Sequence, residues 1–272
     1  MTSGAGERRR DHDDIVHVAI APPKTLGEDL LKRVASLVGK DIVDTRLLLA
    51  GEIPRILVSG LDAGAAGSMA RSLGEAGLMA FVCRDSELRN RPAGFRAHTA
   101  RYGDGGVIFG DRRGGEIRIE AADAFLILRG RIRSPTREKT STTKMKLNVP
   151  ATVLAGGFPI MRRVTDKTAQ ESFQAEDFVR IYDRRSSDPR VEMFQNRMDF
   201  SSLGPDLTPS APTNFAIVVA KLREWFPLAI FDERLTRRFM TDVPAAGPEG
   251  ALEIHCRLIT LGYLAVKTRE HQ

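Results

Sequence analysis

The sequence predicts an α+β fold in which a small module of strands and helices precedes a domain rich in antiparallel strands. Two observations carry this prediction. Residues 15–83 alternate short apolar segments with amphipathic stretches of helical spacing, and turn or capping residues mark the boundaries. After residue 95 the apolar period changes to two, and it returns to helical spacing only near Thr213. We therefore expect a β-α-α-β-α-β module, an antiparallel β domain and a helix that caps it.

Length and composition favour a globular protein with two modest domains. The chain has 272 residues, of which 42% are hydrophobic and 28% charged, as is ordinary for soluble domains. The longest apolar runs fall far short of the roughly 20 residues that a membrane-spanning helix needs. Cys83 and Cys256 are far apart and lack a CxxC spacing. We expect a bacterial, cytoplasmic protein with free thiols, and a long-range disulfide stays open as the alternative.

The first module is read from its boundary residues. Residues 1–13 are expected to be a disordered tail, and the module itself to span residues 14–83. Thr25 and Glu28 form a capping-box pattern, and Asp41 and Asp62 are expected to cap the next two helices. The expected elements are a strand at 15–20, helices at 25–39, 41–51 and 62–77, and strands at 56–58 and 78–83. Three helices should then pack on one face of a small sheet.

These residues carry a resemblance to a known family. The run TLGEDLLKRVASLVGKDIVDTRLLLAGEIPRILVSGLDAGAAGSMARSLGEAGLMAFV resembles the C-terminal domain of the bacterial ribosomal stalk protein. The adaptor of the Clp protease has a similar fold. The likeness lies in element order and apolar pattern, and it implies a protein-contact module. The lysine-rich face of the stalk domain has no counterpart here, because eight acidic residues between Asp14 and Glu75 balance the basic ones.

The second domain follows a polar linker at residues 84–94. Strands are expected from Phe95 to Tyr102, at 107–109, 116–120 and 124–133, and then at 145–149, 152–155, 178–182 and 191–200. The segment GDGGVIFG at 103–110 is interpreted as a hairpin turn, because it lacks the ending of a phosphate-binding loop. Thr213 is expected to cap an amphipathic helix that Pro227 ends.

Residues 95–228 resemble, in topology only, a pleckstrin-homology-like (PH-like) domain. In that family a bent antiparallel sheet is plugged at one end by the final helix. A general β-barrel with a docked helix would fit nearly as well. Residues 229–272 are assigned to a C-terminal extension.

Basic charge is concentrated in residues 84–146, which carry 15 Lys and Arg against 8 Asp and Glu. Alternating arginines in a strand share one face, and guanidinium groups pair bidentately with phosphates. The sequence thus predicts an anion-binding face, with a charge-protected strand edge as the alternative. The candidate residues are Arg129, Arg131, Arg133, Lys139, Lys144 and Lys146.

No catalytic, cofactor or metal motif accompanies this charge. Among the five histidines only His98, in a predicted strand, is a candidate for a pocket. Nucleic acid is not favoured, because aromatic residues are few and no recognition motif is present. We expect a non-enzymatic adaptor that contacts a protein through its first module and an anionic lipid or acidic segment through its β domain. The alternative is an enzyme or small-ligand sensor with a site between the domains.

Overall fold

The computed structural model describes residues 15–89, 94–147, 161–237 and 247–270. The chain divides into two compact units, of which the first combines Met1–Ile132 with Asp177–Gln272 and the second is Arg133–Glu176. Helices and antiparallel sheets together confirm the α+β class. The described strands do not close into a barrel, so the barrel alternative was wrong. The predicted disordered tail at 1–13 lies outside the described residues.

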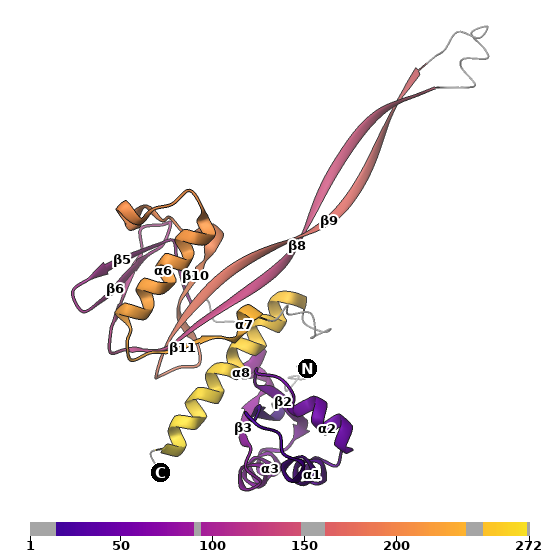
Figure 1. The fold of residues 1–272 in the computed structure, drawn as a ribbon, viewed down its shortest axis with the longest axis vertical. Coiled ribbons are helices and arrows are strands. Elements are labelled where there is room, and N and C mark those ends of the chain that lie inside the picture. The colour runs from indigo at the N-terminus through magenta and orange to yellow at the C-terminus, as the bar shows by residue number, and fades with distance from the viewer. Residues whose placement is uncertain (1–14, 90–93, 148–160, 238–246, 271–272) are drawn as a thin grey trace, which may run out of the picture. The chain divides into compact units, whose positions relative to one another are not determined.

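The first module has the predicted order of elements (Figure 1). Its central strand β1 pairs antiparallel with β2 on one side and with β3 on the other. The elements are β1 Val16–Ala21, α1 Glu28–Val38, α2 Ile42–Leu49, β2 Arg55–Leu61, α3 Ala63–Glu75 and β3 Met79–Arg84.

Capping explains two of the three helix starts. The Asp41 and Asp62 carboxylates accept hydrogen bonds from the backbone N–H three residues later, at 2.7 and 2.8 Å. The predicted capping box of Thr25 and Glu28 was wrong. Helix α1 begins at Glu28 itself, and its N-cap is Gly27, which has no side chain to accept a hydrogen bond.

Alternation along β1 gives the sheet two buried faces. Val16, Val18 and Ile20 face the three helices and pack with their buried residues, as predicted. Ala19 and Phe81 face the other side, where they pack against helix α8. We expected the three helices on one face of the sheet, and α8 buries the other face, where His17 is also buried.

The β domain contains two sheets. A three-stranded antiparallel sheet has the order β5-β6-β7, and a five-stranded mixed sheet has the order β11-β8-β9-β10-β4. The predicted hairpin at Gly105 is confirmed as the β5–β6 turn, where this glycine adopts a φ of 78°. The strands are β4 Phe95–Ala97, β5 Thr99–Gly103, β6 Gly106–Gly110, β7 Glu116–Glu120, β8 Ala124–Leu147, β9 Met161–Asp183, β10 Pro189–Phe194 and β11 Ile230–Glu233.

Helix α6, Ala211–Trp225, packs against both sheets with one apolar stripe. Phe215, Val218 and Leu222 on this stripe are buried in the same core as Val107 and Ile181 of the sheets. The cap is Ser210, three residues before the predicted Thr213. Two short 3₁₀ turns, Gln195–Arg197 and Ser201–Asp206, precede this helix.

Strands β8 and β9 are longer than expected. The stretch 134–144, where the sequence analysis placed no strand, belongs to β8, which runs without a break to Leu147. Residues 133–147 and 161–176 of these hydrogen-bonded strands form the second unit, a two-stranded ribbon. The strand expected at 152–155 lies outside the described residues.

The predicted linker and C-terminal extension both contain regular structure. Asp85–Arg89 forms the short helix α4, whose Leu88 is buried beside α8. After β11, the extension contains α7, Arg234–Arg237, and the long helix α8, Gly247–Glu270. Within the described residues, no helix is both long and apolar enough to cross a membrane.

Candidate anion-binding site

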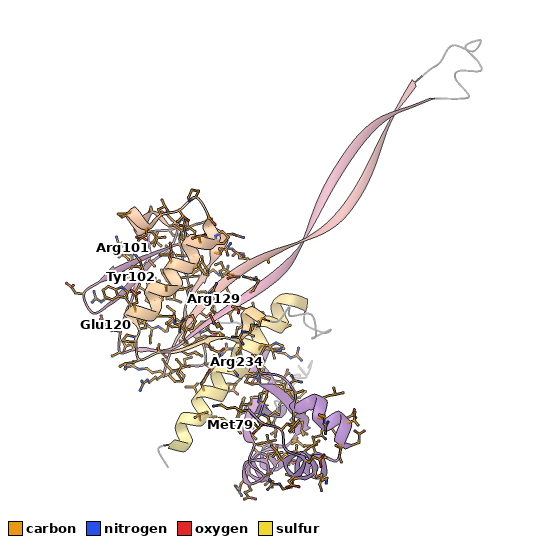
Figure 2. The ribbon with its side chains drawn as sticks, viewed as in Figure 1. Met79, Arg101, Tyr102, Glu120, Arg129 and Arg234 are labelled. Carbon is orange, nitrogen blue, oxygen red and sulfur yellow. The ribbon has the colours of Figure 1, made fainter. Side chains whose placement is uncertain are left out.

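The structure pairs two of the predicted anion-binding residues with a carboxylate. Arg129 (Figure 2) and Arg131, on β8, lie 2.9 and 2.6 Å from the two carboxylate oxygens of Asp177 on β9. Burial alone would raise the pKa of Asp177, yet hydrogen bonds and charges from the two arginines lower it below its ordinary value. One of their two positive charges is therefore already balanced within the fold.

The other predicted residues are placed only by their backbone. Arg133, Lys139, Lys144 and Lys146 lie on β8 in the second unit, and their side chains are outside the described part of the structure. Anion binding by this strand stays a prediction.

A larger basic cavity surrounds His98, the histidine that the sequence analysis selected. We call it the His98 cavity. Its volume is about 670 Å³, within the range of roughly 300–1,000 Å³ that is usual for small-molecule sites. It is lined by Gly94, Phe95, Arg96, Ala97, His98, Asp111, Arg112, Arg113, Phe194 and Arg197.

Positive charge dominates this lining, with four arginines against one carboxylate. The Asp111 carboxylate accepts hydrogen bonds from the backbone N–H groups of Arg113 and Gly115, which closes a tight turn. Among the described residues, no carboxylate lies within ion-pair distance of Arg112, Arg113 or Arg197. The cavity therefore presents guanidinium groups that have no carboxylate partner, and of these Arg112 contacts the His98 ring through its Nε.

His98 fixes the geometry of the cavity floor. Its backbone N–H donates to Gly110, and its carbonyl accepts from Asp199, each at 2.7 Å. Its ring Nδ1 contacts the carbonyl oxygen of Arg197. The Arg112 Nε also lies 3.5 Å from this nitrogen, which holds that guanidinium beside the imidazole. The contact with Arg197 joins the segment between β4 and β5 to the 3₁₀ turn after β10.

Aromatic rings line the same cavity. The Arg197 guanidinium lies over the Phe194 ring, with its Cζ 4.8 Å from the ring centroid. This stacking holds the long side chain in a fixed direction, because a guanidinium is attracted to an aromatic face. Phe95 supplies a second ring. The lining thus combines charge with partly apolar walls, as ligand pockets usually do.

A chain of ion pairs leads from the exposed Arg96 at this cavity to buried groups beyond it. Arg96 lies 3.8 Å from Glu192, whose other oxygen lies 2.8 Å from Arg180. Arg180 in turn lies 2.7 Å from Glu253 on α8, and Arg257 lies 3.7 Å from the same carboxylate. Burial raises the pKa of Glu192, although Arg180 opposes this. The chain links one wall of the cavity to the C-terminal helix.

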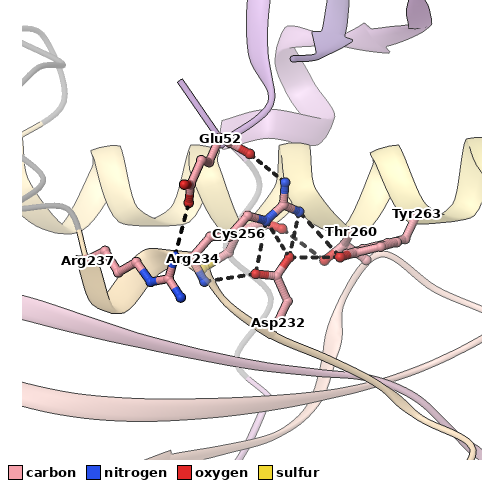
Figure 3. Close-up of polar contacts among 7 residues, drawn as sticks. All are labelled: Glu52, Asp232, Arg234, Arg237, Cys256, Thr260 and Tyr263. Atoms are coloured by element: carbon pink, nitrogen blue, oxygen red, sulfur yellow. Dashed lines mark hydrogen bonds and ion pairs between the residues drawn. The ribbon is translucent and has the colours of Figure 1, made fainter. Parts of the chain in front are cut away.

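A separate polar cluster joins the first module to the C-terminal extension (Figure 3). The Asp232 carboxylate lies 2.6 Å from Arg234 and accepts a hydrogen bond of 3.1 Å from the Tyr263 hydroxyl. The same arginine donates to the backbone carbonyl of Glu52. Asp232 is buried, and each of its oxygens is matched by a donor, which is typical of a structural contact.

The cysteines do not form a reactive site. Cys83 and Cys256 are both free and buried, which settles the open disulfide alternative. Burial raises the pKa of each thiol to about 12, so both are protonated at neutral pH. Cys83 lies opposite His17 on the neighbouring strand, but a protonated thiol is a poor nucleophile. Within the described residues no group of three His, Cys, Asp or Glu side chains could hold a metal ion.

Comparison with protein-family models, with curated proteins and with solved structures finds no match. The site therefore rests on its own geometry. His98 was a candidate from the sequence, whereas the arginines that surround it were not predicted to form a site. Arg112 and Arg113 could have been noted as adjacent bases in a turn, whereas Arg197 is brought to the cavity only by the fold.

Proposed function

We propose that this protein is a non-enzymatic interaction protein whose β domain binds an anionic ligand in the His98 cavity. The observation that carries the proposal is a cavity of about 670 Å³ lined by Arg112, Arg113 and Arg197. Among the described residues, no carboxylate lies within ion-pair distance of these three guanidinium groups. Guanidinium groups form strong, bidentate hydrogen bonds with phosphate and carboxylate oxygens. The charge and the size together suit a ligand that bears phosphate groups.

The first module supplies the second half of the proposal, contact with a protein partner. Helix α2 exposes Val43 at 69% and Leu47 at 65% of their surface, on adjacent turns of the same face. Ile42 beside them is 44% exposed. Such apolar groups favour a partner that presents apolar side chains, although the anionic ligand provides the sharper test.

The alternative was an enzyme or small-ligand sensor with a site between the domains, whereas the His98 cavity offers a small ligand a place within the β domain. All of its lining residues lie between Gly94 and Arg197, within the β domain. A ligand that binds there without being converted supports a sensor or adaptor, whereas turnover of the ligand would favour an enzyme. The experiment should therefore follow both binding and the chemical fate of the ligand.

The test is isothermal titration of the full chain with inorganic pyrophosphate at constant ionic strength, with phosphate release followed in parallel. We expect Arg112→Ser/Arg113→Ser to weaken binding by about tenfold or more, since a hydrogen bond to a charged group contributes about 1.5–3 kcal/mol. The matched control is Arg46→Ser/Arg71→Ser, which removes the same charge from exposed positions in the first module. The proposal would be refuted if both double variants weakened pyrophosphate binding equally, or if neither variant weakened it.

A further inference from the structure

A second, smaller cavity lies where β7, β9 and β10 meet. We call it the Arg184 cavity. Its volume is about 190 Å³, below the roughly 300 Å³ at which pockets begin to admit drug-sized ligands. Its lining includes Arg118, Asp123, Arg184, Arg185 and Arg190. None of these residues lines the His98 cavity.

Two of the carboxylates beside the cavity, Asp183 and Glu120, are already engaged, whereas Asp123 has no ion pair among the described residues. The Asp183 carboxylate lies 3.1 Å from Arg190 and also accepts from the backbone N–H of Arg185 at 2.9 Å. Arg118 is held by Glu120 at 2.5 Å. Each of these contacts neutralises one arginine and fixes its side chain at the wall.

Two arginines in the turn between β9 and β10 have no such partner. Among the described residues, no carboxylate lies within ion-pair distance of Arg184 or of the Arg185 guanidinium. Tyr182 and Ile181, which form the inner wall, are fully buried. An anion there would be shielded from water on one side, which strengthens its attraction to the two guanidinium groups.

We propose that the Arg184 cavity binds a small oxyanion, of the size of inorganic phosphate or a short carboxylic acid, independently of the His98 cavity. The volume excludes a nucleotide-sized ligand, and the lining supplies a pair of free guanidinium groups for a single anionic group. Phosphate and carboxylate share this chemistry, so the two sources are separated by titrating each.

The test uses inorganic phosphate, with acetate as the second probe, in the Arg112→Ser/Arg113→Ser/Arg197→Ser background, which removes from the His98 cavity the three arginines that have no carboxylate partner. Binding is followed by isothermal titration of the full chain at constant ionic strength. Adding Arg184→Ser/Arg185→Ser should weaken the binding of phosphate, of acetate or of both by about tenfold or more. Arg184→Lys/Arg185→Lys keeps the charge but loses the bidentate geometry, and should have an intermediate effect.

The control again removes two exposed arginines of the first module, with Arg46→Ser/Arg71→Ser in the same background. Absence of phosphate and acetate binding in the background protein would overturn the proposal, as would an affinity that the Arg184→Ser/Arg185→Ser change leaves unaltered. An equal loss in the control would also overturn it. The result is separate from that for the His98 cavity, because pyrophosphate binding there depends on Arg112 and Arg113 and not on the turn.

Discussion

Replacing Arg180 with methionine tests whether the buried ion-pair chain holds helix α8 to the β domain. Arg180 lies between Glu192 at 2.8 Å and Glu253 at 2.7 Å, and its side chain is 9% exposed. Arg180→Met keeps most of the packing volume but leaves two carboxylates in a buried site. Removing one partner of a buried pair costs about 3–5 kcal/mol, because the remaining charge loses its compensation.

The stability lost in Arg180→Met should depend on pH. Burial raises the pKa of Glu192 in the folded protein, so ionised Glu192 lowers the folding stability, and this cost is fully present above the folded-state pKa of Glu192. This penalty is relieved as the pH falls through that value. Without Arg180, which opposes the effect of burial, Glu192 should take up a proton more readily. The stability lost in Arg180→Met should therefore be largest at neutral pH and should shrink as the solution is acidified.

The assay is urea unfolding followed by the fluorescence of the single tryptophan, Trp225, which packs against the core of the β domain. With a slope of about 3 kcal/mol per molar urea, the midpoint should fall by roughly 1 M or more. The matched control is Arg101→Met, which breaks an ion pair with Glu116 whose side chains are 58% and 52% exposed. It should cost at most about 1 kcal/mol. A loss in Arg180→Met no greater than in this control would refute the reasoning.

Two further predictions concern β8 and its neighbours. Asp177→Asn should destabilise the protein by about 1–2 kcal/mol at neutral pH, because Arg129 and Arg131 lose their counter-charge. Because the pKa of Asp177 is lowered in the folded protein, its ionised carboxylate stabilises the fold at pH values above its ordinary pKa, and this stability is lost as the pH falls through the folded-state pKa. The urea midpoints of Asp177→Asn and the parent protein should therefore converge in acid. A difference between the two midpoints that does not change with pH would contradict this. Gly130→Ala should cost about 1–3 kcal/mol in the same assay, because its Cβ would lie 2.4 Å from a ring carbon of Phe178. In Gly67→Ala, inside helix α3, the added Cβ has no atom within 4 Å, so this control should leave the stability unchanged or raise it. Equal urea midpoints for Gly130→Ala and Gly67→Ala would count against the packing argument.

The elements of the first module could be predicted because their signals are local. Asp41 and Asp62 cap helices within three residues of themselves, and Gly39 ends α1 with a φ of 65°. Alternation along β1 likewise identified the face that packs on the helices. The failed capping box shows the limit of such patterns. Thr25 had the right spacing to Glu28, but the chain placed Gly27 at the N-cap instead.

The full length of β8 and β9 could not be predicted from local sequence signals. The stretch 134–144 was not expected to be a strand, because no alternation of apolar residues marks it there. It belongs to β8 because β9 is its hydrogen-bonded neighbour. The register of that pairing also decided that Arg129 and Arg131 meet Asp177, which stands 46 residues or more along the chain.

The sequence by itself determined the α+β class, the order of the first module and the basic character of the β domain, because propensity, capping and charge belong to short segments. It also directed attention to His98. Only the tertiary structure decided which arginines remain free. Arg129 and Arg131 meet a carboxylate, whereas Arg112, Arg113 and Arg197 line a cavity in which, among the described residues, none of the three lies within ion-pair distance of one. The reason is physical: an ion pair depends on distances between segments far apart in sequence, and those distances are set by strand register and helix packing.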